Sequence, residues 1–530
     1  MKVPEMILPM KKNIILHPLL FSVIPILALF EHNQDIASPH YLTQPLCLTV
    51  LTTIVFFYLI NFFINNPLKS ALLSSVGVMS FFFFADFSQL FSWIDAIIAG
   101  DKSYYKNVSL IIYLLFFISL AGLLYKSKKN FQKLNILLNI FSVVVICLQI
   151  FNITSYQIKN SSEQLYSKSP QNDITKQREK SLKNLPDIYY IVLDGYGRQD
   201  IFKNLYNYDN SDFINYLKSK NFYVADQATT NYNKTLLSIP STLNMDYIDQ
   251  IKKQSGFEIS DRKFFRNIIK ENLVSTILEK SGYTFVTLPY TWFGNYENLK
   301  SDIHIKAQHE QNDFNAILIN KTPIYALATP SELRASQAKT LEILEAIPKI
   351  SEFPESTFSY IHLMASHPPF IFDENGSVEK ITPECFSGGD GNDYYRTCPG
   401  VEKFRESLQK QVTYFNKRFE EIIEEILSRS AIQPIIIIQG DHGPGSAFHQ
   451  TSLEQSNIEE RMSILNAYLV PAEIKKELYS EISPVNSFRL ILNHLLGYDF
   501  KKLEDKNYFI IDGVGEQTID ITSDIKALNQ

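Results

Sequence analysis

The sequence predicts an α-helical membrane anchor followed by an α/β domain with a mostly parallel central sheet. The first third of the 530 residues contains five apolar segments, each close to the roughly 20 residues that cross a bilayer. Behind them, short apolar strands alternate with helical stretches, the pattern of a parallel sheet covered by helices. The length also exceeds the roughly 100–200 residues of one domain. We therefore predict an anchor at residues 1–154, a polar juxtamembrane linker at 155–184 and the α/β domain at 185–530.

Five segments form the predicted transmembrane helices, and the basic residues between them predict their orientation. The first is not a signal peptide, because no small-residue cleavage site follows it and four further segments do. Lys11 and Lys12 precede the first segment, Lys69 follows the second, and Lys126 and Lys128 follow the fourth, which places these loops inside. The prediction is a multi-pass protein of the plasma (inner) membrane with a cytoplasmic N-terminus and an extracytoplasmic α/β domain. The segments lie at about Ile14–Phe30, Leu46–Ile64, Ala71–Trp93, Val108–Tyr125 and Leu134–Ile153.

One acidic residue lies within these apolar segments. Asp86 follows a run of phenylalanines toward the outer end of the third segment, and at the bilayer centre its charge would cost about 2.5–3.5 kcal/mol. It could form part of a path for a lipid headgroup, or it could be an interfacial carboxylate bonded to a neighbouring helix. The second interpretation is favoured, because the residue lies near the membrane surface.

The remaining sequence predicts a sheet with helices on its faces, and its charge excludes one class of partner. Lys and Arg number 50 and Asp and Glu 56, giving a net charge of −6, so no basic field is available to bind a nucleic-acid backbone. No nucleic-acid partner is expected. The predicted strands are Asp187–Leu193, Tyr283–Leu288, Thr357–Leu363, Ile435–Ile438 and Ile464–Val470. The predicted helices are Val274–Glu279, Glu332–Ala346, Phe404–Ser428 and Val485–Leu496.

Metal-binding residue types follow two of the predicted strands. Asp194 comes directly after the first strand, and Asp441 and His442 come three and four residues after the end of the fourth. Ligands bind beyond the carboxyl ends of strands in open α/β sheets, so these side chains are expected to share one crevice. An isolated Asp at such a position is more often a turn or cap residue, but the adjacent Asp and His between Gly440 and Gly443 are harder to explain that way. Carboxylate with imidazole suits Zn or Mn.

Three further histidines lie near the same predicted edge. His362 ends the third strand and, taken alone, is interpreted as a structural histidine. His367 precedes a proline pair and is expected to face the crevice, while His449 follows His442 by seven residues. Each could be structural, but together with the residues above they make a metal site the better interpretation.

A hydroxyl group is available where a loop enters a predicted helix. Thr235, Ser238 and Pro240 stand in a spacing in which a Thr lies five residues before a Pro, with a Ser two residues before that Pro. With the strand-end residues, this motif resembles the alkaline phosphatase superfamily, in particular its membrane-anchored, sulfatase-like branch. That branch contains phosphoethanolamine transferases and lipoteichoic acid synthases. The resemblance extends from the first strand through at least Gly443, and the anchor is typical of the branch.

The resemblance implies a catalytic α/β domain in which Thr235 is the nucleophile. It implies a divalent metal ion, Zn or Mn, held by Asp194, Asp441, His442 and the Thr235 hydroxyl. His367 would act as a phosphate-binding or acid/base residue. His449 would share that role. Two departures are Asp194, where the transferases usually have Glu, and the lack of cysteines flanking Thr235.

The implied reaction moves a phosphate-linked headgroup, phosphoethanolamine or phosphoglycerol, by way of a phospho-threonine. A membrane phospholipid is the expected donor, and an envelope glycan, a lipid or water is the expected acceptor. A phosphoester hydrolase has the same core and stays an alternative. So does a sulfatase, since Ser238–Ser241 resembles the start of its formylglycine motif, although Thr242 stands where that motif has Arg. A catalytically inactive lipid-binding protein is a third alternative.

Cys385 and Cys398 lie in the predicted extracytoplasmic domain, where thiols are generally oxidised, and predict a disulfide. Between them, Asp390 and Asp393 lie in a glycine-rich loop. Their spacing lacks the remainder of an EF-hand, so they are interpreted as turn residues rather than calcium ligands.

Overall fold

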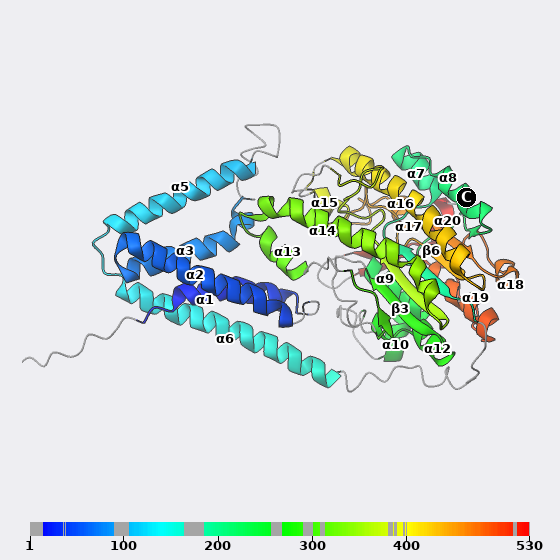
Figure 1. The fold of residues 1–530 in the computed structure, drawn as a ribbon, viewed down its shortest axis with the longest axis horizontal. Coiled ribbons are helices and arrows are strands. Elements are labelled where there is room, and N and C mark those ends of the chain that lie inside the picture. The colour runs from blue at the N-terminus through cyan, green and yellow to red at the C-terminus, as the bar shows by residue number, and fades with distance from the viewer. Residues whose placement is uncertain are drawn as a thin grey trace, which may run out of the picture. The chain divides into compact units, whose positions relative to one another are not determined.

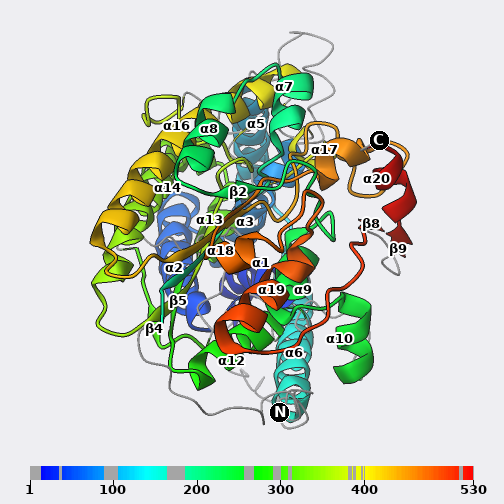
Figure 2. The same cartoon turned by 90° about the vertical axis from the view of Figure 1, so that its right-hand side faces the viewer.

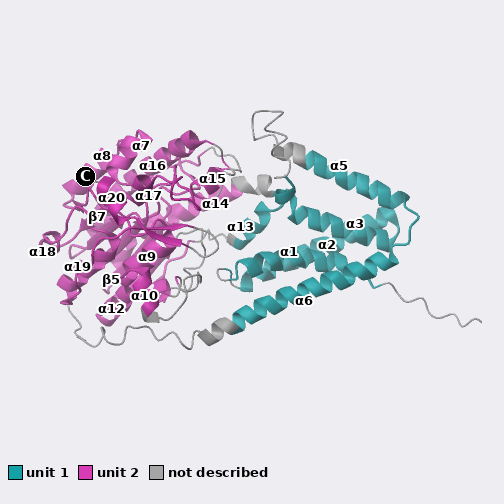
Figure 3. Cartoon of the chain, turned by 180° about the vertical axis from the view of Figure 1, so that it is seen from behind, with its two compact units in different colours: residues 1–166, 312–328 teal, residues 167–311, 329–530 magenta. Residues whose placement is uncertain are grey.

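The structure is a computed structural model of the chain (Figure 1). It describes residues 14–34, 37, 39–88, 105–163, 185–255, 265, 268–289, 300–307, 313–379, 385, 389–395, 398, 400–511 and 517–528. These residues divide into two compact units, coloured in Figure 3. The helical unit comprises residues 1–166 and 312–328, and the α/β unit comprises residues 167–311 and 329–530. Most of the predicted linker, residues 164–184, lies outside the described residues.

The helical unit has a helix in each of the five predicted apolar segments. Two of its described helices are long and apolar enough to cross a membrane, at Pro39–Ile64 and Gln132–Ile158. The others are shorter apolar helices at His17–His32, Pro67–Phe82 and Leu110–Lys126. The first two of these, with 16 residues each, rise about 24 Å, less than the roughly 30 Å of hydrocarbon. Of the five predicted spans, the described residues therefore supply two strong candidates. The helices are α1 (His17–His32), α2 (Thr43–Ile64), α3 (Pro67–Phe82), α5 (Tyr105–Lys126) and α6 (Gln132–Glu163).

The third predicted segment, Ala71–Trp93, is described only in part. Helix α3 ends at Phe82, residues 84–88 are again helical, and residues 89–104 lie outside the described part. Asp86 follows this end and lies 3.6 Å from Lys321, just after α13 (Asp313–Asn320) of the same unit. Both side chains are about half exposed. This ion pair fits the interpretation of Asp86 as an interfacial, paired carboxylate.

The α/β unit is built on a sheet that has seven strands among the described residues. Their order is β2-β7-β6-β1-β5-β3-β4, and every neighbouring pair is parallel except the two that involve β7. The predicted mostly parallel sheet and all five predicted strands are confirmed. The two-residue strands β2 and β4, and a separate β8–β9 pair, are too short for an apolar pattern to predict. The strands are β1 (Ile188–Leu193), β2 (Tyr223–Val224), β3 (Thr284–Pro289), β4 (Ile303–His304), β5 (Thr357–Leu363), β6 (Ile435–Gln439), β7 (Asn466–Leu469), β8 (Tyr508–Ile511) and β9 (Gln517–Asp520).

Helices cover both faces of this sheet, because alternate residues of each strand point to opposite sides. In β1, Tyr189, Ile191 and Leu193 pack into one core, and Ile188, Tyr190 and Val192 into the other. Figure 2 shows α8 and α16 on one side of the strands and α12 and α19 on the other. The predicted helices are confirmed within a few residues, except that α14 begins earlier. The covering helices include α7 (Gln199–Tyr206), α8 (Ser211–Ser219), α12 (Leu273–Lys280), α14 (Tyr325–Ala346), α16 (Val401–Arg429) and α19 (Pro484–Leu496).

Candidate metal and nucleophile site

The carboxyl ends of β1 and β6 bring the predicted acidic residues together. The two strands are parallel neighbours with Val192 beside Gln439, so the residues that follow them leave the sheet at one edge. A side chain at Gly440 would lie 2.4 Å from the backbone oxygen of Tyr196, so only glycine allows the two chains to pass this closely. The backbone N–H of Gly195 then donates to Asp441 Oδ1 over 3.1 Å. The strand ends are thus joined at the site.

Asp194, Asp441 and His442 form a compact group of potential metal ligands. One ligand atom from each lies within 4.8 Å of the other two, and all three side chains are buried. His442 Nε2 is 3.5 Å from Asp194 Oδ1 and 3.5 Å from Asp441 Oδ2. The Thr235 hydroxyl lies 3.2 Å from the same nitrogen. The structure therefore places all four predicted metal-site residues around one point.

The hydrogen bonding of these atoms fits a bound cation. Asp194 Oδ1 and Asp441 Oδ2 are buried and accept no hydrogen bond from the residues that the structure describes. Burying an ionised oxygen without a partner is costly, and a cation between the two carboxylates would remove that cost. The Nδ1 of His442 lies 2.9 Å from the carbonyl oxygen of Gly443 and donates to it, which leaves the Nε2 lone pair directed at the carboxylates. The donor set suits Zn or Mn.

Thr235 is the first residue of α9 (Thr235–Asn244). The free N–H groups and the dipole of a helix N-terminus favour an anion there, so a phosphoryl group bound beside Thr235 would gain stabilisation. Ser238, one turn further, is buried, and its hydroxyl donates to the Tyr232 carbonyl over 2.8 Å. Of these two hydroxyls, that of Thr235 faces the metal-ligand group.

Electrostatics keep the Asp194 carboxylate ionised and the His442 imidazole neutral. Burial alone raises the pKa of Asp194, but nearby imidazoles, of which His367 has the largest effect, outweigh it and bring that pKa below its usual range. Burial and the Arg461 guanidinium lower the pKa of His442. A neutral imidazole and ionised carboxylates are the forms that bind metal ions.

His362 and His367 both lie close to this group. His362 Nε2 is 3.2 Å from Asp194 Oδ2, on the side of the carboxylate away from Oδ1. The interpretation of His362 as a purely structural histidine thus missed its contact with a candidate metal ligand. The ring centroids of His367 and His442 are 6.1 Å apart, so His367 lies within reach of a group bound beside the metal ligands.

His449 has no recorded contact with these residues within the described part of the chain. Its backbone N–H donates to Ser456 Oγ over 2.9 Å, and its Nδ1 lies 3.3 Å from the Thr451 hydroxyl. Both partners belong to its own loop. The predicted catalytic role of His449 remains a prediction, whereas the other predicted site residues cluster as described.

The sequence did not predict a buried ion pair that lies beside the site. Arg461 donates to the carboxylate of Asp390, and both side chains are buried. Asp390 does accept the N–H of Gly391, as a turn residue would, but the turn interpretation is incomplete because its other oxygen belongs to this pair. An acidic residue in a glycine-rich loop carries no local signal of a partner 71 residues away.

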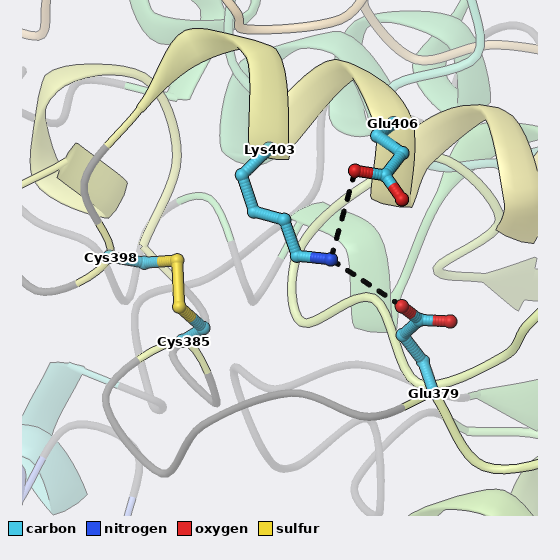
Figure 4. The surroundings of a disulfide bond; sticks show 5 residues. All are labelled: Glu379, Cys385, Cys398, Lys403 and Glu406. Carbon is cyan, nitrogen blue, oxygen red and sulfur yellow. Dashed lines mark ion pairs between the residues drawn. A yellow bond between two sulfur atoms is a disulfide. The ribbon is translucent and has the colours of Figure 1, made fainter. Parts of the chain in front are cut away.

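The predicted disulfide between Cys385 and Cys398 is confirmed (Figure 4). Next to it, Lys403 lies between two carboxylates, 3.5 Å from Glu379 and 4.0 Å from Glu406. Both cysteines are buried, so the bond lies in the core rather than on an exposed strap.

Comparisons with known proteins identify the α/β unit. The sulfatase family model matches residues 186–482, more than half of the chain. A search of curated proteins gave no match. Among solved structures, the periplasmic domain of phosphoethanolamine transferase EptC from Campylobacter jejuni is 14% identical with a TM-score of 0.36, covering 59% of this chain and 90% of that one.

Two further solved structures resemble this chain to a similar degree. Phosphoethanolamine transferase EptA from Neisseria meningitidis, described as an integral membrane protein, is 11% identical with a TM-score of 0.40 and covers 91% of this chain and 94% of that one. A 2-O GAG sulfatase is 12% identical with a TM-score of 0.40 and covers 64% and 86%. Similarity this low does not transfer an activity.

Metal removal should lower the stability of the α/β unit. Chelated protein is expected to melt several degrees below protein with Zn or Mn at about 100 times Kd, because such binding contributes about 2.7 kcal/mol. In Asp441→Asn, added metal should leave the melting temperature unchanged. Asp187→Asn is the control, since Asp187 caps the opposite end of β1, where its carboxylate accepts from Thr357. Equal metal-induced shifts in both variants would contradict the site.

Removing the disulfide should destabilise the protein. The bond closes a loop with a sequence separation of 13 residues, and a loop of about 15 residues contributes roughly 3 kcal/mol through unfolded-state entropy. Cys385→Ser with Cys398→Ser is therefore expected to lower the melting temperature by several degrees, with a smaller effect on metal affinity. Free-thiol labelling of both cysteines in intact membranes would contradict the bond.

Proposed function

The chain belongs to the sulfatase family, and from that premise we propose that it is a membrane-anchored, metal-dependent transferase of phosphate-linked headgroups. This family membership agrees with the predicted resemblance to the alkaline phosphatase superfamily. The observation that carries the proposal is the Thr235 hydroxyl, 3.2 Å from His442 Nε2 and beside two buried carboxylate oxygens. The proposed substrate is a phospholipid, and phosphoethanolamine or phosphoglycerol is the group moved.

The residues of the site have separate roles in this proposal. Asp194, Asp441 and His442 would hold the cation together with Thr235. When bound, the cation lowers the pKa of the Thr235 hydroxyl and offsets negative charge on the phosphoryl group. Thr235 Oγ1 then attacks phosphorus, the bond to the lipid alcohol breaks, and that alcohol leaves with a proton. In the second step the acceptor hydroxyl attacks the phospho-threonine and restores Thr235.

The surrounding groups suit a phosphoryl substrate. The N-terminus of α9 supplies free backbone N–H groups for its oxygens. His367 would bind a non-bridging oxygen, and its Nδ1 donates to the Pro368 carbonyl over 2.7 Å, which fixes the ring. His449 is proposed to share this role, as the family resemblance implies. Acid/base assistance of this kind typically contributes about 10²–10⁴-fold in rate.

We infer that the α/β unit acts outside the cytoplasm while the helical unit anchors it in the plasma membrane. The disulfide supports an oxidising compartment for the α/β unit. The lysines of the loops after α2 and α5 support a cytoplasmic N-terminus, provided that the three shorter helices also cross the bilayer. This arrangement brings the site to lipid headgroups and to envelope glycans or lipids as acceptors.

The nucleophile assignment distinguishes this proposal from a sulfatase. Thr235→Ala is expected to lower turnover by about three orders of magnitude or more while leaving the melting temperature within a few degrees. Ser238→Ala, the control, should retain turnover within about tenfold, because its hydroxyl is bonded to a backbone carbonyl. The reverse result would instead favour the formylglycine position of a sulfatase.

The donor can be identified by the mass added to the protein. After incubation with phosphatidylethanolamine or phosphatidylglycerol and no acceptor, the peptide containing Thr235 is expected to gain the mass of one headgroup. Thr235→Ala should gain none. A lipid that is turned over to free headgroup phosphate without any added mass, even under rapid quenching, would contradict the covalent intermediate.

A further inference from the structure

Asp390 and Arg461 form a buried ion pair that contacts both the segment of Thr235 and the segment of His442 in the proposed site. Their relative exposures are 6% and 3%. Two charges this deeply buried need several good contacts to be tolerated, so each of their partners is informative. The partners belong to three segments that are distant in the sequence.

Arg461 joins the segment of the nucleophile to the segment of the metal ligands. Its Nε donates to the carbonyl oxygen of Asn233 over 2.8 Å, two residues before Thr235. Its Nη1 donates to the carbonyl oxygen of Gly443 over 3.3 Å, directly after His442. The guanidinium also lies over the ring of Phe448, 4.1 Å from its centroid. A shift of Arg461 would therefore move Thr235 relative to His442.

Asp390 fixes Arg461 and at the same time faces His367. Its Oδ2 pairs with Arg461 Nη1 and lies 3.9 Å from His367 Nε2. Its Oδ1 accepts the N–H of Gly391 over 2.8 Å. A side chain at Gly445 would lie 2.1 Å from this oxygen, so glycine is required there for Asp390 to enter.

The loop that carries Asp390 is closed by the disulfide and docked beside the site. Cys385 and Cys398 lie on either side of Asp390 in the sequence. Within the loop, the Asn392 N–H donates to the Phe448 carbonyl over 2.9 Å, and the Asn392 side chain accepts the Gln450 N–H over 2.8 Å. The disulfide thus restrains the loop whose contacts hold Asp390 in place.

We propose that Asp390 is a positioning residue which, through Arg461 and His367, holds the segments of Thr235 and His442 in their reactive arrangement, with the Cys385–Cys398 disulfide restraining its loop. This inference rests on the proposed function for its catalytic consequence. Its structural part, the coupling of the disulfide loop to both segments of the site, is independent of that function and is testable without substrate.

Glu379 provides a matched control. It is buried to the same extent as Asp390, with 6% exposure, and it is also paired, lying 3.2 Å from Lys410 and 3.5 Å from Lys403. Figure 4 shows it beside the same disulfide. Both lysines belong to α16 rather than to the segments of Thr235 and His442. Glu379→Gln therefore removes a buried, paired charge near the disulfide without touching the site.

The experiment compares Asp390→Asn, Glu379→Gln and the double variant Asp390→Asn with Arg461→Gln in the full-length protein. Turnover of phosphatidylethanolamine, melting temperature and metal content are measured for each. We expect Asp390→Asn to lower kcat about 10- to 100-fold, because small displacements of reacting groups have effects of this size. Metal content should stay at the wild-type value, and Glu379→Gln should keep kcat within about twofold.

The double variant separates positioning from stability. Removing both charges should restore much of the melting temperature lost in Asp390→Asn, since no unpaired buried charge remains. The loss in kcat should persist, because the Arg461 guanidinium that bridges Asn233 and Gly443 is then absent. Recovery of kcat together with melting temperature, or a kcat of Asp390→Asn within about twofold of the wild type, would overturn the proposal.

Hydrogen exchange tests the coupling without any substrate. In Asp390→Asn, and in protein with the disulfide reduced, exchange should rise in both residues 231–238 and residues 441–450, and it should not rise there in Glu379→Gln. Unchanged exchange in both segments would overturn the positioning role. Raised exchange in a protein whose wild type turns over none of the lipids would support the coupling while contradicting the proposed function.

Discussion

Two buried carboxylate oxygens, which accept no hydrogen bond from any described residue, are the constraint on which the proposed site depends. Asp194 Oδ1 and Asp441 Oδ2 lie at the carboxyl ends of adjacent parallel strands, where each is held near an imidazole nitrogen. Such a pair would repel if nothing positive lay between them. A divalent cation satisfies this constraint, and the same cation suits the chemistry that the family supports.

The residues that could be predicted from the sequence are those whose position follows from one strand and the turn after it. An apolar run such as Ile188–Leu193 identifies a buried strand, and Asp194 must then lie at the edge where ligands bind. Asp441 and His442 follow from β6 in the same way. Thr235 could be predicted as a site residue only from the family resemblance, because a hydroxyl at the start of a helix otherwise predicts only a helix cap.

The residues that could not be predicted depend on contacts between distant segments. His362 is an ordinary strand residue in sequence, and only the register of β1 beside β5 brings it to Asp194. Arg461 lies in the short helix α17 (Ile458–Met462), and Asp390 lies in a glycine-rich loop that is distant from it in the sequence. The apolar composition of the first third also predicted five spans, of which the described residues supply two strong candidates by helix length and composition. The sequence shows the type of each of these residues, but it does not show the tertiary contacts that they make or the lengths of the helices.

Asp194 itself shows how the surroundings compensate for a local departure. The transferases that the sequence resembles usually have Glu at this position, and the Asp side chain is shorter by one methylene group. The N–H of Asp194 donates to the Leu363 carbonyl over 2.8 Å, and its carbonyl accepts the Ser366 N–H over 3.2 Å. These bonds tie the turn after β1 to the end of β5. The backbone of Asp194 is thus fixed on both sides, and its short side chain has few rotamers. Little conformational entropy is lost when this side chain lies beside Asp441 and His442, which favours a preformed site.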